Sequence, residues 1–492
     1  MDRDADDSPI VLLPLAIAIG LAFFAALLQA GSRLPLHYPV VYLVLLLLPF
    51  VSMPPQVRAR WSSLGDVLVA RTLPSADGWN LALWGLAIAG ALIRLLATFA
   101  PEAGMDALGM HLLMPSMLAR DHAWMPAQSG FVWAWMPMAV DWIYALAYVP
   151  GGEAAARLIN FSADLMLLMG CAGIARLAAG VRAGAIAAAL YSTCPLTYLL
   201  TSSLFVENLW ALWLGAALAL MTSLHWRNST WRTYAACGLL WGAALAAKTM
   251  TLFWLPLALY FAYGQFRSEG RSAVRPLAIV GAVALAVGGV PYAVAWWEAG
   301  NPVFPFMNHI FQSPLYPSSA FESPYHQPVN WRILFDLTFA TGNYLEALPG
   351  SFGLAWLALL PAGLLGLLVG GGRWMRALVV VSVFVAGLTL WLTSYLRYIA
   401  PMLPVWAVLT SIGLRCLRWN GAHAAVAAIT VACGLAGLVL FAGSTWWYRA
   451  LPARGPLDPS EYRQWEAVMR PEARLVQRAN DLGLRNVLWL GR

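Results

Sequence analysis

Charge is scarce in this chain, and lysine is almost absent from it. Only 11% of the 492 residues are charged and 61% are hydrophobic, whereas roughly a quarter of the residues in a soluble domain are charged. The mean hydropathy is +0.67. Apolar runs of about 17 to 25 residues, the length that crosses a hydrocarbon core, recur along almost the whole sequence. The shortage of charge therefore excludes a large soluble domain and predicts an all-α polytopic membrane protein.

Paired cysteines and continuous basic patches are also missing. The five cysteines are an odd number without metal-type spacing, so we interpret them as small core residues. The net charge of +7 comes from basic residues that lie singly or in pairs. Nucleic acid is therefore not expected as a partner. The acidic start and the lack of a clear cleavage site after residues 9–30 predict a retained anchor, not a signal peptide.

The apolar runs predict about 13 transmembrane helices. Their expected ranges are 9–30, 38–54, 80–100, 153–175, 183–202, 206–225, 233–248, 250–266, 276–297, 351–371, 376–394, 398–418 and 423–447. With the N-terminus in the cytoplasm, the inside loops carry fourteen arginines, namely Arg58, Arg60, Arg71, Arg176, Arg182, Arg227, Arg232, Arg267, Arg271, Arg275, Arg373, Arg376, Arg415 and Arg418. The outside connections carry only Arg33, Arg120, Lys248, Arg332 and Arg397. This bias follows the positive-inside rule and predicts an extracytoplasmic C-terminus.

Three regions follow from this topology. Residues 1–79 form two N-terminal transmembrane helices and a cytoplasmic loop, 80–447 form the core, and 448–492 form a small extracytoplasmic tail. The core has two long outer loops, about 101–152 and 298–350. We place 136–150 on the membrane surface, because a crossing there would invert every later loop. In the tail, Asp458 before Pro459 predicts a helix start, Gly483 a stop, and Asn486 to Leu490 a single strand.

Ionisable residues gather at the predicted outer face. Lys248, the only lysine, lies where the 34 residues between Arg232 and Arg267 must turn back, because one helix of that length would exceed a bilayer. Glu207 begins a helix after a short outer turn. Asp106, His111, Asp141, Arg397 and Tyr398 lie at the same level. Charges beside the bilayer are costly and usually have a function.

Each candidate also has a structural interpretation. Asp106 could be a helix N-cap, Glu207 a first-turn acid opposite the helix dipole, and Arg397 a capping or snorkelling cation. His111 could be an ordinary interfacial residue. Lys248 is harder to explain in this way, because the chain otherwise uses arginine and a compact ammonium can meet one phosphate oxygen. Arg157 and Asp164, seven residues apart on one helix, are interpreted as a structural polar network.

Five short motifs, in order, resemble a known family. Residues 106–115 (DALGMHLLMP) resemble a D-x-x-x-Y-H-L-x-x-P pattern, and 300–308 (GNPVFPFMN) resemble G-N-P-x-[YF]-P-[FL]-x-N. The other three are 135–144 (WMPMAVDWIY), 242–249 (GAALAAKT) and 397–401 (RYIAP). They are similar to motifs of bacterial GT-C fold glycosyltransferases, relatives of protein O-mannosyltransferases and lipid A aminoarabinose transferases. Met110 departs from the aromatic residue of the pattern, and Glu207 stands where relatives often have Asp.

The resemblance implies an enzyme of the bacterial inner membrane with its site on the extracytoplasmic face. It would move a hexose or pentose from a polyprenyl-phosphate carrier to a lipid, glycan or protein acceptor. We predict Asp106 as general base, with Lys248, Arg397 and His111 on the donor phosphate. Asp141 and Glu207 form an acceptor or second acidic site. Asn301, Pro302, Asn308 and Tyr398 belong to a loop that is either a lid or a rigid connector.

Two alternatives and one cofactor question stay open at this point. A transporter or flippase of an anionic substrate would also use charges in the membrane, although it would more often show internal repeats. A scaffold without activity would need Asp106 only for stability. No cofactor is expected with certainty, because the outer acids and histidines lack a compact ligand spacing. A divalent cation held by Asp106 and Glu207 is an alternative.

Overall fold

The described part of the chain is helical throughout. A computed structural model describes residues 9–51, 77–126, 131–223, 229–319, 326–344, 349–416, 422–444 and 458–470, with a few positions between 475 and 483. Every regular element in these ranges is a helix, which confirms the all-α prediction. The loop arginines Arg58, Arg60, Arg71, Arg227 and Arg418 and the expected strand Asn486 to Leu490 lie outside the described residues.

The first third of the chain forms three helices and the first of the two long loops. The helices are α2 (Pro9–Ala30), α3 (Pro39–Val51) and α5 (Gly78–Thr98). The loop contains the π-helix η1 (Ala107–His111), α6 (Leu113–Asp121) and the 3-10 helix η3 (Val132–Trp135). It leads into α7 (Ala139–Ala179), whose helical geometry is interrupted at Gly152 with φ +71°. The segment expected at the membrane surface is therefore a helix that meets the next one at this kink.

The next predicted helix, 183–202, is wrong as a single unit. It divides into α8 (Val181–Ser192) and α9 (Pro195–Ser202), which are bent by 58°. Pro195 has no N–H to continue the helix, and the residue before a proline is driven to extended geometry. Cys194 has φ −70° and ψ 121°. The apolar run hid the break, because hydropathy does not register backbone geometry.

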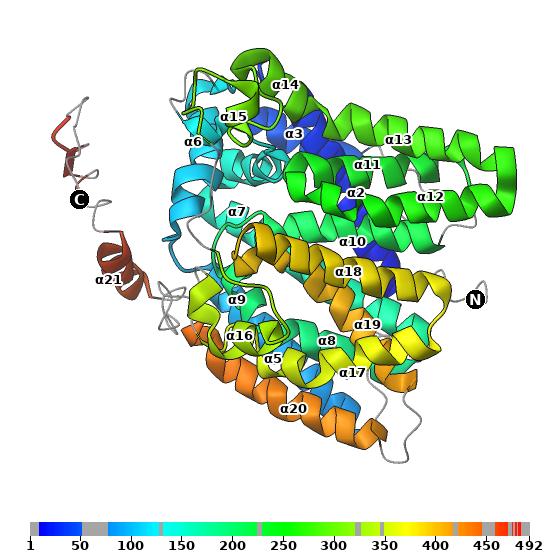
Figure 1. Cartoon of the computed structure of the whole chain (residues 1–492). Helices are drawn as coiled ribbons and strands as arrows, with labels where there is room; N and C mark the ends of the chain where they lie inside the picture. The colour runs from blue at the N-terminus through cyan, green and yellow to red at the C-terminus, as the bar shows by residue number, and fades with distance from the viewer. Residues whose placement is uncertain are drawn as a thin grey trace.

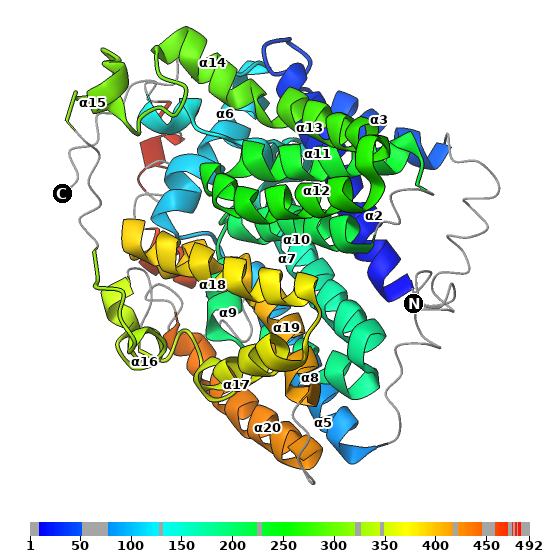
Figure 2. The ribbon, with the colours of Figure 1, turned by 45° about the vertical axis from the view of Figure 1, so that its right-hand side comes forward.

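The middle of the chain forms a series of helices that begins in the core and continues beside it. It consists of α10 (Glu207–Ser223), α11 (Trp231–Ala247), the 3-10 helix η5 (Thr249–Trp254), α12 (Leu255–Glu269), η6 (Gly270–Ala273), α13 (Val274–Gly288) and α14 (Val290–Ala299). Figures 1 and 2 both show α13 beside α11, on which it packs. The helix junction expected at Lys248 is present, since α11 ends at Ala247 and Lys248 is extended.

The last third adds the second outer loop and the final helices. The elements are α15 (Asn308–Phe311), α16 (Ile333–Phe339), η7 (Thr341–Tyr344), α17 (Leu354–Gly370), α18 (Arg373–Leu392), η8 (Leu396–Ile399), α19 (Met402–Cys416), α20 (Ala422–Leu440), η9 (Phe441–Gly443) and α21 (Pro459–Met469). The predicted helix start in the tail is confirmed. Asp458 Oδ1 accepts the N–H of Ser460 at 2.8 Å.

The core lies where α7, α8, α10 and α19 pack together. Helix α7 packs on α2 and α8, α11 on α13, and α17 on α19. Helices α17 and α19 approach closely through glycine, because a Cβ on Gly413 would meet the backbone oxygen of Gly363. Small residues at such crossings let helix backbones touch, which is how helices associate in a bilayer.

Several helices are suited to a membrane. Among the described residues, five helices are long and apolar enough to span it, or six if the bent pair α8 and α9 is one span. Four shorter apolar helices accompany them. The chain is thus an integral membrane protein. The total of about 13 spans, their orientation and the three-region division stay predictions.

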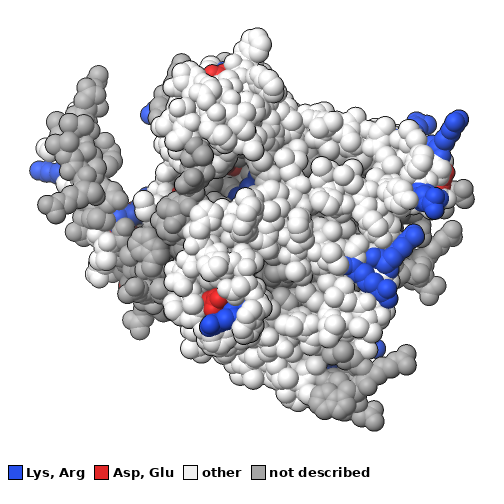
Figure 3. All heavy atoms as spheres, viewed as in Figure 1, with Lys and Arg blue, Asp and Glu red and all other residues white. Residues whose placement is uncertain are grey.

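Arginines collect at one end of this bundle. Arg267 and Arg271 lie at the turn between α12 and α13, and Arg373 begins α18. Figure 3 shows the blue atoms of basic residues at that end of the molecule. Arg232 is the second residue of α11 and Lys248 follows its last residue, so the lysine lies at the opposite end of the helix from the arginines.

Candidate functional site: a cluster of four charged residues

Four charged side chains from distant segments meet at the ends of their helices. Asp106 precedes η1, Glu207 opens α10, Lys248 follows α11, and Arg397 lies in η8. The Lys248 ammonium lies 2.5 Å from Oε1 of Glu207, and Nε of Arg397 lies 3.8 Å from the same oxygen. Arg397 also donates to Oδ2 of Asp106. We call these residues the outer cluster, after the membrane face predicted for them from the sequence: two carboxylates alternate with two cations.

The turn at Lys248 is held by hydrogen bonds to the last carbonyls of α11. The hydroxyl of Thr251 donates to the oxygen of Ala244 at 2.7 Å, and the hydroxyl of Tyr292 donates to that of Leu245 at 3.0 Å. The oxygen of Ala244 also accepts the N–H of Lys248 at 3.1 Å, whereas the final carbonyls of a helix generally lack an intrahelical partner. The indole of Trp210 donates to Thr251 at 2.8 Å. The side chains thus stabilise the helix end that presents Lys248 to Glu207.

Aromatic rings border both cations. The ammonium of Lys248 lies 3.6 Å from the ring centre of Tyr398 and 5.3 Å from that of Trp210. The guanidinium of Arg397 lies 4.7 Å from the ring centre of Phe205. Ring faces attract cations while they exclude water. Tyr398, expected among the loop residues, therefore lies against Lys248.

The four side chains of the outer cluster differ in their exposure to solvent. The exposed fraction of the side chain is 2% for Glu207, 8% for Arg397, 16% for Lys248 and 32% for Asp106. Oε2 of Glu207 is buried and accepts no hydrogen bond from any described residue. Figure 3 shows a hollow between the regions of α15 and α18 in which acidic and basic atoms are visible. A buried carboxylate oxygen without a hydrogen-bond partner can still accept a hydrogen bond from a ligand.

Asp106 is not the helix cap that spacing alone allowed. It occupies the N-cap position of η1, but its side chain makes no capping hydrogen bond. Its carboxylate turns to Arg397 instead. Burial raises the pKa of this carboxyl, but the guanidinium of Arg397 outweighs burial and holds the pKa below its ordinary value. Asp106 is therefore a carboxylate at neutral pH, as a general base must be.

His111 and Asp141 form a separate buried pair. Nδ1 of His111 lies 2.6 Å from Oδ1 of Asp141. Burial lowers the pKa of His111, but the charge of Asp141 and its hydrogen bond outweigh burial and raise it. Asp106 and Glu207 act on the histidine in the same direction. The structure thus joins two residues that the sequence placed in different roles.

The asparagines of the second loop bond to the backbone of their own segment. Asn301 donates to the oxygen of Phe306 at 2.9 Å and accepts from the N–H of Val303 at 3.0 Å. Asn308 donates to the oxygen of Tyr316 at 2.8 Å. Both asparagines are fully buried. They and Pro302 belong to a segment that these hydrogen bonds tie together, and its role as lid or rigid connector stays a prediction.

This loop packs against two other parts of the outer end. The indole of Trp135 donates to Glu298 at 3.3 Å, and its ring lies edge-on to Phe304 at 5.6 Å. The N–H of Gln327 donates to the hydroxyl of Ser394 at 2.7 Å, three residues before Arg397. The second loop thus joins the first loop to the segment that carries Arg397.

Sequence reasoning missed two residues that form buried ion pairs. The single network predicted for Arg157 and Asp164 is two networks: Arg157 contacts Glu102 at 3.4 Å, and Asp164 accepts from Arg94 at 2.8 Å. All four side chains are buried. A lone arginine such as Arg94 inside an apolar helix was the available signal, because it requires a partner.

A divalent cation at Asp106 and Glu207 stays a prediction. Within the described ranges, no three side chains of His, Cys, Asp or Glu are grouped so that they could hold a metal ion. Both carboxylates are in contact with cationic side chains. A metal would have to displace these cations, so we assign it no step.

Comparison with known structures identifies the fold. No family model and no curated protein sequence matches the chain. The crystal structure of ArnT from Cupriavidus metallidurans bound to undecaprenyl phosphate matches with a TM-score of 0.53 and 18% identity, over 82% of this chain and 73% of that one. The apo structure of the same ArnT matches with a TM-score of 0.53 and 17% identity, over 76% and 68%. The chain therefore has the GT-C fold of ArnT, as its motifs had led us to expect.

Proposed function

We propose that the chain is a glycosyltransferase that moves a sugar from a polyprenyl-phosphate carrier to an acceptor at the outer face of the membrane. The observation that carries this proposal is the outer cluster, in which Lys248 and Arg397 converge beside Asp106 and Glu207. The ArnT structure with bound undecaprenyl phosphate supports a lipid phosphate as ligand of this fold. Lys248 lies at the end of the bundle where the loops carry few arginines, which supports a site on the outer side of the membrane.

The cations of the outer cluster suit a leaving phosphate. Transfer breaks the bond between the anomeric carbon and the phosphate oxygen, and the bonding electrons stay on the phosphate. Lys248 and Arg397 would stabilise this growing charge, and their partial burial strengthens the attraction. Glu207 keeps the ammonium in place. The polyprenyl chain of the donor would lie along the apolar helices.

Asp106 would activate the acceptor. A hydroxyl of the acceptor attacks the anomeric carbon and transfers its proton to the carboxylate of Asp106, so free polyprenyl phosphate and the glycosylated acceptor are formed. Asp106 is the most exposed member of the outer cluster, which suits a group that meets an incoming substrate. Its low pKa keeps the base deprotonated. His111, paired with Asp141, has a raised pKa and would add positive charge to the site when it is protonated.

The decisive experiment follows the lipid product. The purified protein is incubated in lipid nanodiscs with undecaprenyl phosphates that carry a hexose or a pentose and with a bacterial envelope extract that supplies lipid, glycan and protein acceptors, and mass spectrometry measures free undecaprenyl phosphate. We expect release by the wild-type protein and a loss of roughly 10²- to 10³-fold in Asp106→Asn. A flippase would move the donor between leaflets with the sugar bond intact, and that result would overturn the proposal. If Asp106→Asn turns over the donor as fast as the wild-type protein, Asp106 is not the general base.

A further inference from the structure

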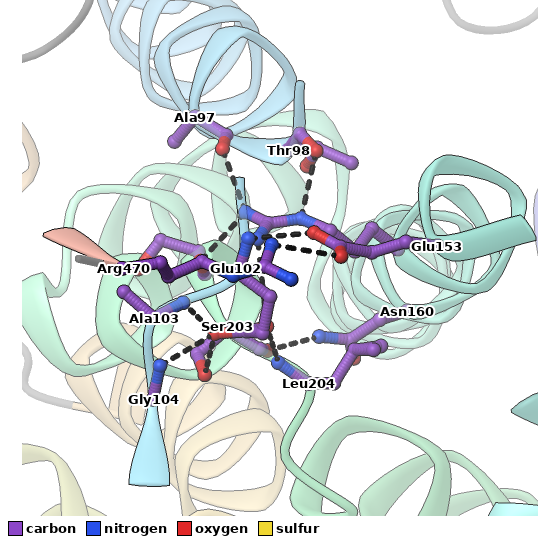
Figure 4. A network of polar contacts seen from close by, with 12 residues as sticks. Ala97, Thr98, Glu102, Ala103, Gly104, Glu153, Asn160, Ser203, Leu204 and Arg470 are labelled. Carbon is purple, nitrogen blue, oxygen red and sulfur yellow. Dashed lines mark hydrogen bonds and ion pairs between the residues drawn. The ribbon is translucent and has the colours of Figure 1, made fainter. Parts of the chain in front are cut away.

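A buried carboxylate that does not belong to the outer cluster connects two segments of the chain. One segment leads to Asp106 and the other leads to Glu207, the two acidic residues of the outer cluster. Glu102 is fully buried. Its Oε1 accepts from the N–H groups of Ala103 and Gly104, both at 2.9 Å, and from the hydroxyl of Ser203 at 2.8 Å. Its Oε2 accepts from the N–H of Leu204 at 2.7 Å. Figure 4 shows this carboxylate between the two chain segments.

Arg157 joins the same segments from the side of α7. Its guanidinium lies 3.4 Å from Oε2 of Glu102. It also donates to the backbone oxygens of Thr98 at 2.8 Å, Ala97 at 2.9 Å and Ser202 at 2.8 Å. One arginine therefore binds the end of α5 and the end of α9. Both ends present carbonyls that their own helices leave without a partner.

Asn160, one turn further along α7, completes the contact with the second segment. Its amide donates to the oxygens of Leu200 and Ser203, both at 2.8 Å. Its oxygen accepts from Asn208 at 3.0 Å, the residue that follows Glu207. The path to Glu207 is thus fixed on both sides of that residue.

The place of these contacts in the sequence connects them to the site. Glu102 lies four residues before Asp106, and Ser203 lies four residues before Glu207. The segments also touch directly, because a Cβ on Gly104 would meet the hydroxyl of Ser203. The carboxylate of Glu102 therefore sets the separation of two short segments just before each presents a carboxylate to Arg397.

The network also reaches the C-terminal tail. Glu153 accepts the N–H of Glu102 at 2.6 Å and lies 3.1 Å from the guanidinium of Arg470, which follows α21. Figure 4 shows Glu153 and Arg470 beside Glu102. The tail thus contacts the outer edge of the network, while Arg157 contacts its buried edge.

We propose that Glu102 and Arg157 are positioning residues, which place Asp106 and Glu207 against Arg397 and Lys248 without touching the substrate. This inference rests on the function proposed for the outer cluster. A buried ion pair by itself adds little net stability. Fully bonded, however, it fixes one geometry, because any shift leaves a buried polar group without a partner. Transfer needs that precision, since displacement of a reacting group by about 1 Å can cost roughly 10²-fold in rate.

The test compares Glu102→Gln with Asp164→Asn in the nanodisc assay for release of undecaprenyl phosphate. Asp164 is the matched control: it is equally buried and ion-paired, but its partners Arg94 and Tyr191 belong to α5 and α8. Both variants should lose thermal stability. We expect kcat per folded molecule to fall about 10- to 10²-fold in Glu102→Gln, with the donor KM within about threefold of the wild type, and to stay near the wild-type value in Asp164→Asn.

The pH profile gives a readout that a loss of stability would not change. The contact with Arg397 holds the pKa of Asp106 low, so a displaced Asp106 should move the acid limb of kcat to higher pH in Glu102→Gln. Gly104→Ala provides a second route, because the added Cβ would clash with the Ser203 hydroxyl that bonds Glu102, while no buried charge is removed. We expect the same lowered kcat and shifted limb. This variant decides the question if Glu102→Gln fails to fold.

The outcomes of the two proposals can be separated. If the wild-type protein releases no undecaprenyl phosphate from any donor, the proposed function fails. If the wild-type protein is active, but Glu102→Gln and Gly104→Ala match Asp164→Asn in kcat and keep the wild-type acid limb, the positioning role is wrong. A raised donor KM with unchanged kcat would also overturn it, because that result places the residues in donor binding.

Discussion

The outer cluster and the buried pairs are both made of opposite charges within an apolar bundle, but their carboxylates are used differently. Glu102 accepts from four hydrogen-bond donors and also faces Arg157. In Glu207, Oε1 meets two cations, whereas Oε2 is buried and accepts no hydrogen bond within the described ranges. The rings of Tyr398 and Phe205 lie beside the cations of the outer cluster. The buried pair at Glu102 instead bonds to the backbone of neighbouring segments.

The difference indicates which charges hold the fold and which are kept for a ligand. A carboxylate with every oxygen occupied has no capacity left for a substrate, and its ion pair stabilises one arrangement of the backbone. A cation held by a partly exposed carboxylate and a ring face can turn to a stronger anion such as a phosphate. Partner saturation therefore separates structural from functional charges better than burial alone.

Breaking a saturated pair should have the largest effect, and it should fall on stability. In Arg94→Leu, Asp164 loses its ion-pair partner in a site that is fully buried. Removal of one partner of such a pair costs about 3–5 kcal/mol. We expect a lower unfolding temperature, measured in detergent, with kcat of the folded fraction unchanged. A stability equal to that of the wild type would contradict the structural interpretation of this pair.

Substitution in the outer cluster should give a slightly smaller effect, and it should fall on catalysis. Lys248→Ala removes the ammonium at Glu207 and Tyr398, so the rate of undecaprenyl phosphate release should fall roughly 10²- to 10³-fold. The unfolding temperature should change little, because Arg397 still contacts Glu207. Lys248→Arg is the control, because it keeps the positive charge but replaces the compact ammonium by a planar guanidinium, and we expect partial activity from it. A strongly destabilised Lys248→Ala protein would place this lysine with the structural charges.

His111 sharpens the comparison through a smaller, pH-dependent effect. Asp141 raises the pKa of His111 above the ordinary value of 6.5 although burial lowers it. The folded state therefore holds the proton more tightly than the unfolded state, and this stabilisation is complete below 6.5 and is lost as the pH rises through the folded-state pKa. We expect the difference in unfolding temperature between the wild type and His111→Gln to shrink as the pH rises above about 6.5. A constant difference would mean that the pair is neutral.

The predictions from sequence succeeded where one physical rule governed a segment. Hydropathy located the long helices, and length arithmetic placed a helix end at Lys248. The cap at Asp458 follows from side-chain chemistry that acts within two residues. The prediction failed at Pro195, because the apolar pattern continues across a break that only backbone geometry causes.

The sequence predicted several residues of the site but not the contacts between them, for a related reason. Asp106, Lys248 and Arg397 are few enough in an apolar chain to be noticed one by one. Their partners are 41 to 291 residues away, and no local pattern encodes such contacts. Glu102 went unnoticed because its partners are the N–H groups of the two residues that follow it and two groups of a distant turn, at Ser203 and Leu204.

The sequence by itself determined that the chain is an all-α membrane protein, where its long helices lie and which charges are unusual, because these depend on composition and on spacing along one helix. Only the tertiary structure decided that Lys248 meets Glu207, that Asp106 meets Arg397, and that Glu102 joins the segments before them. Packing between helices brings these residues together. Each contact depends on several helix ends at once, and no single stretch of sequence contains that information.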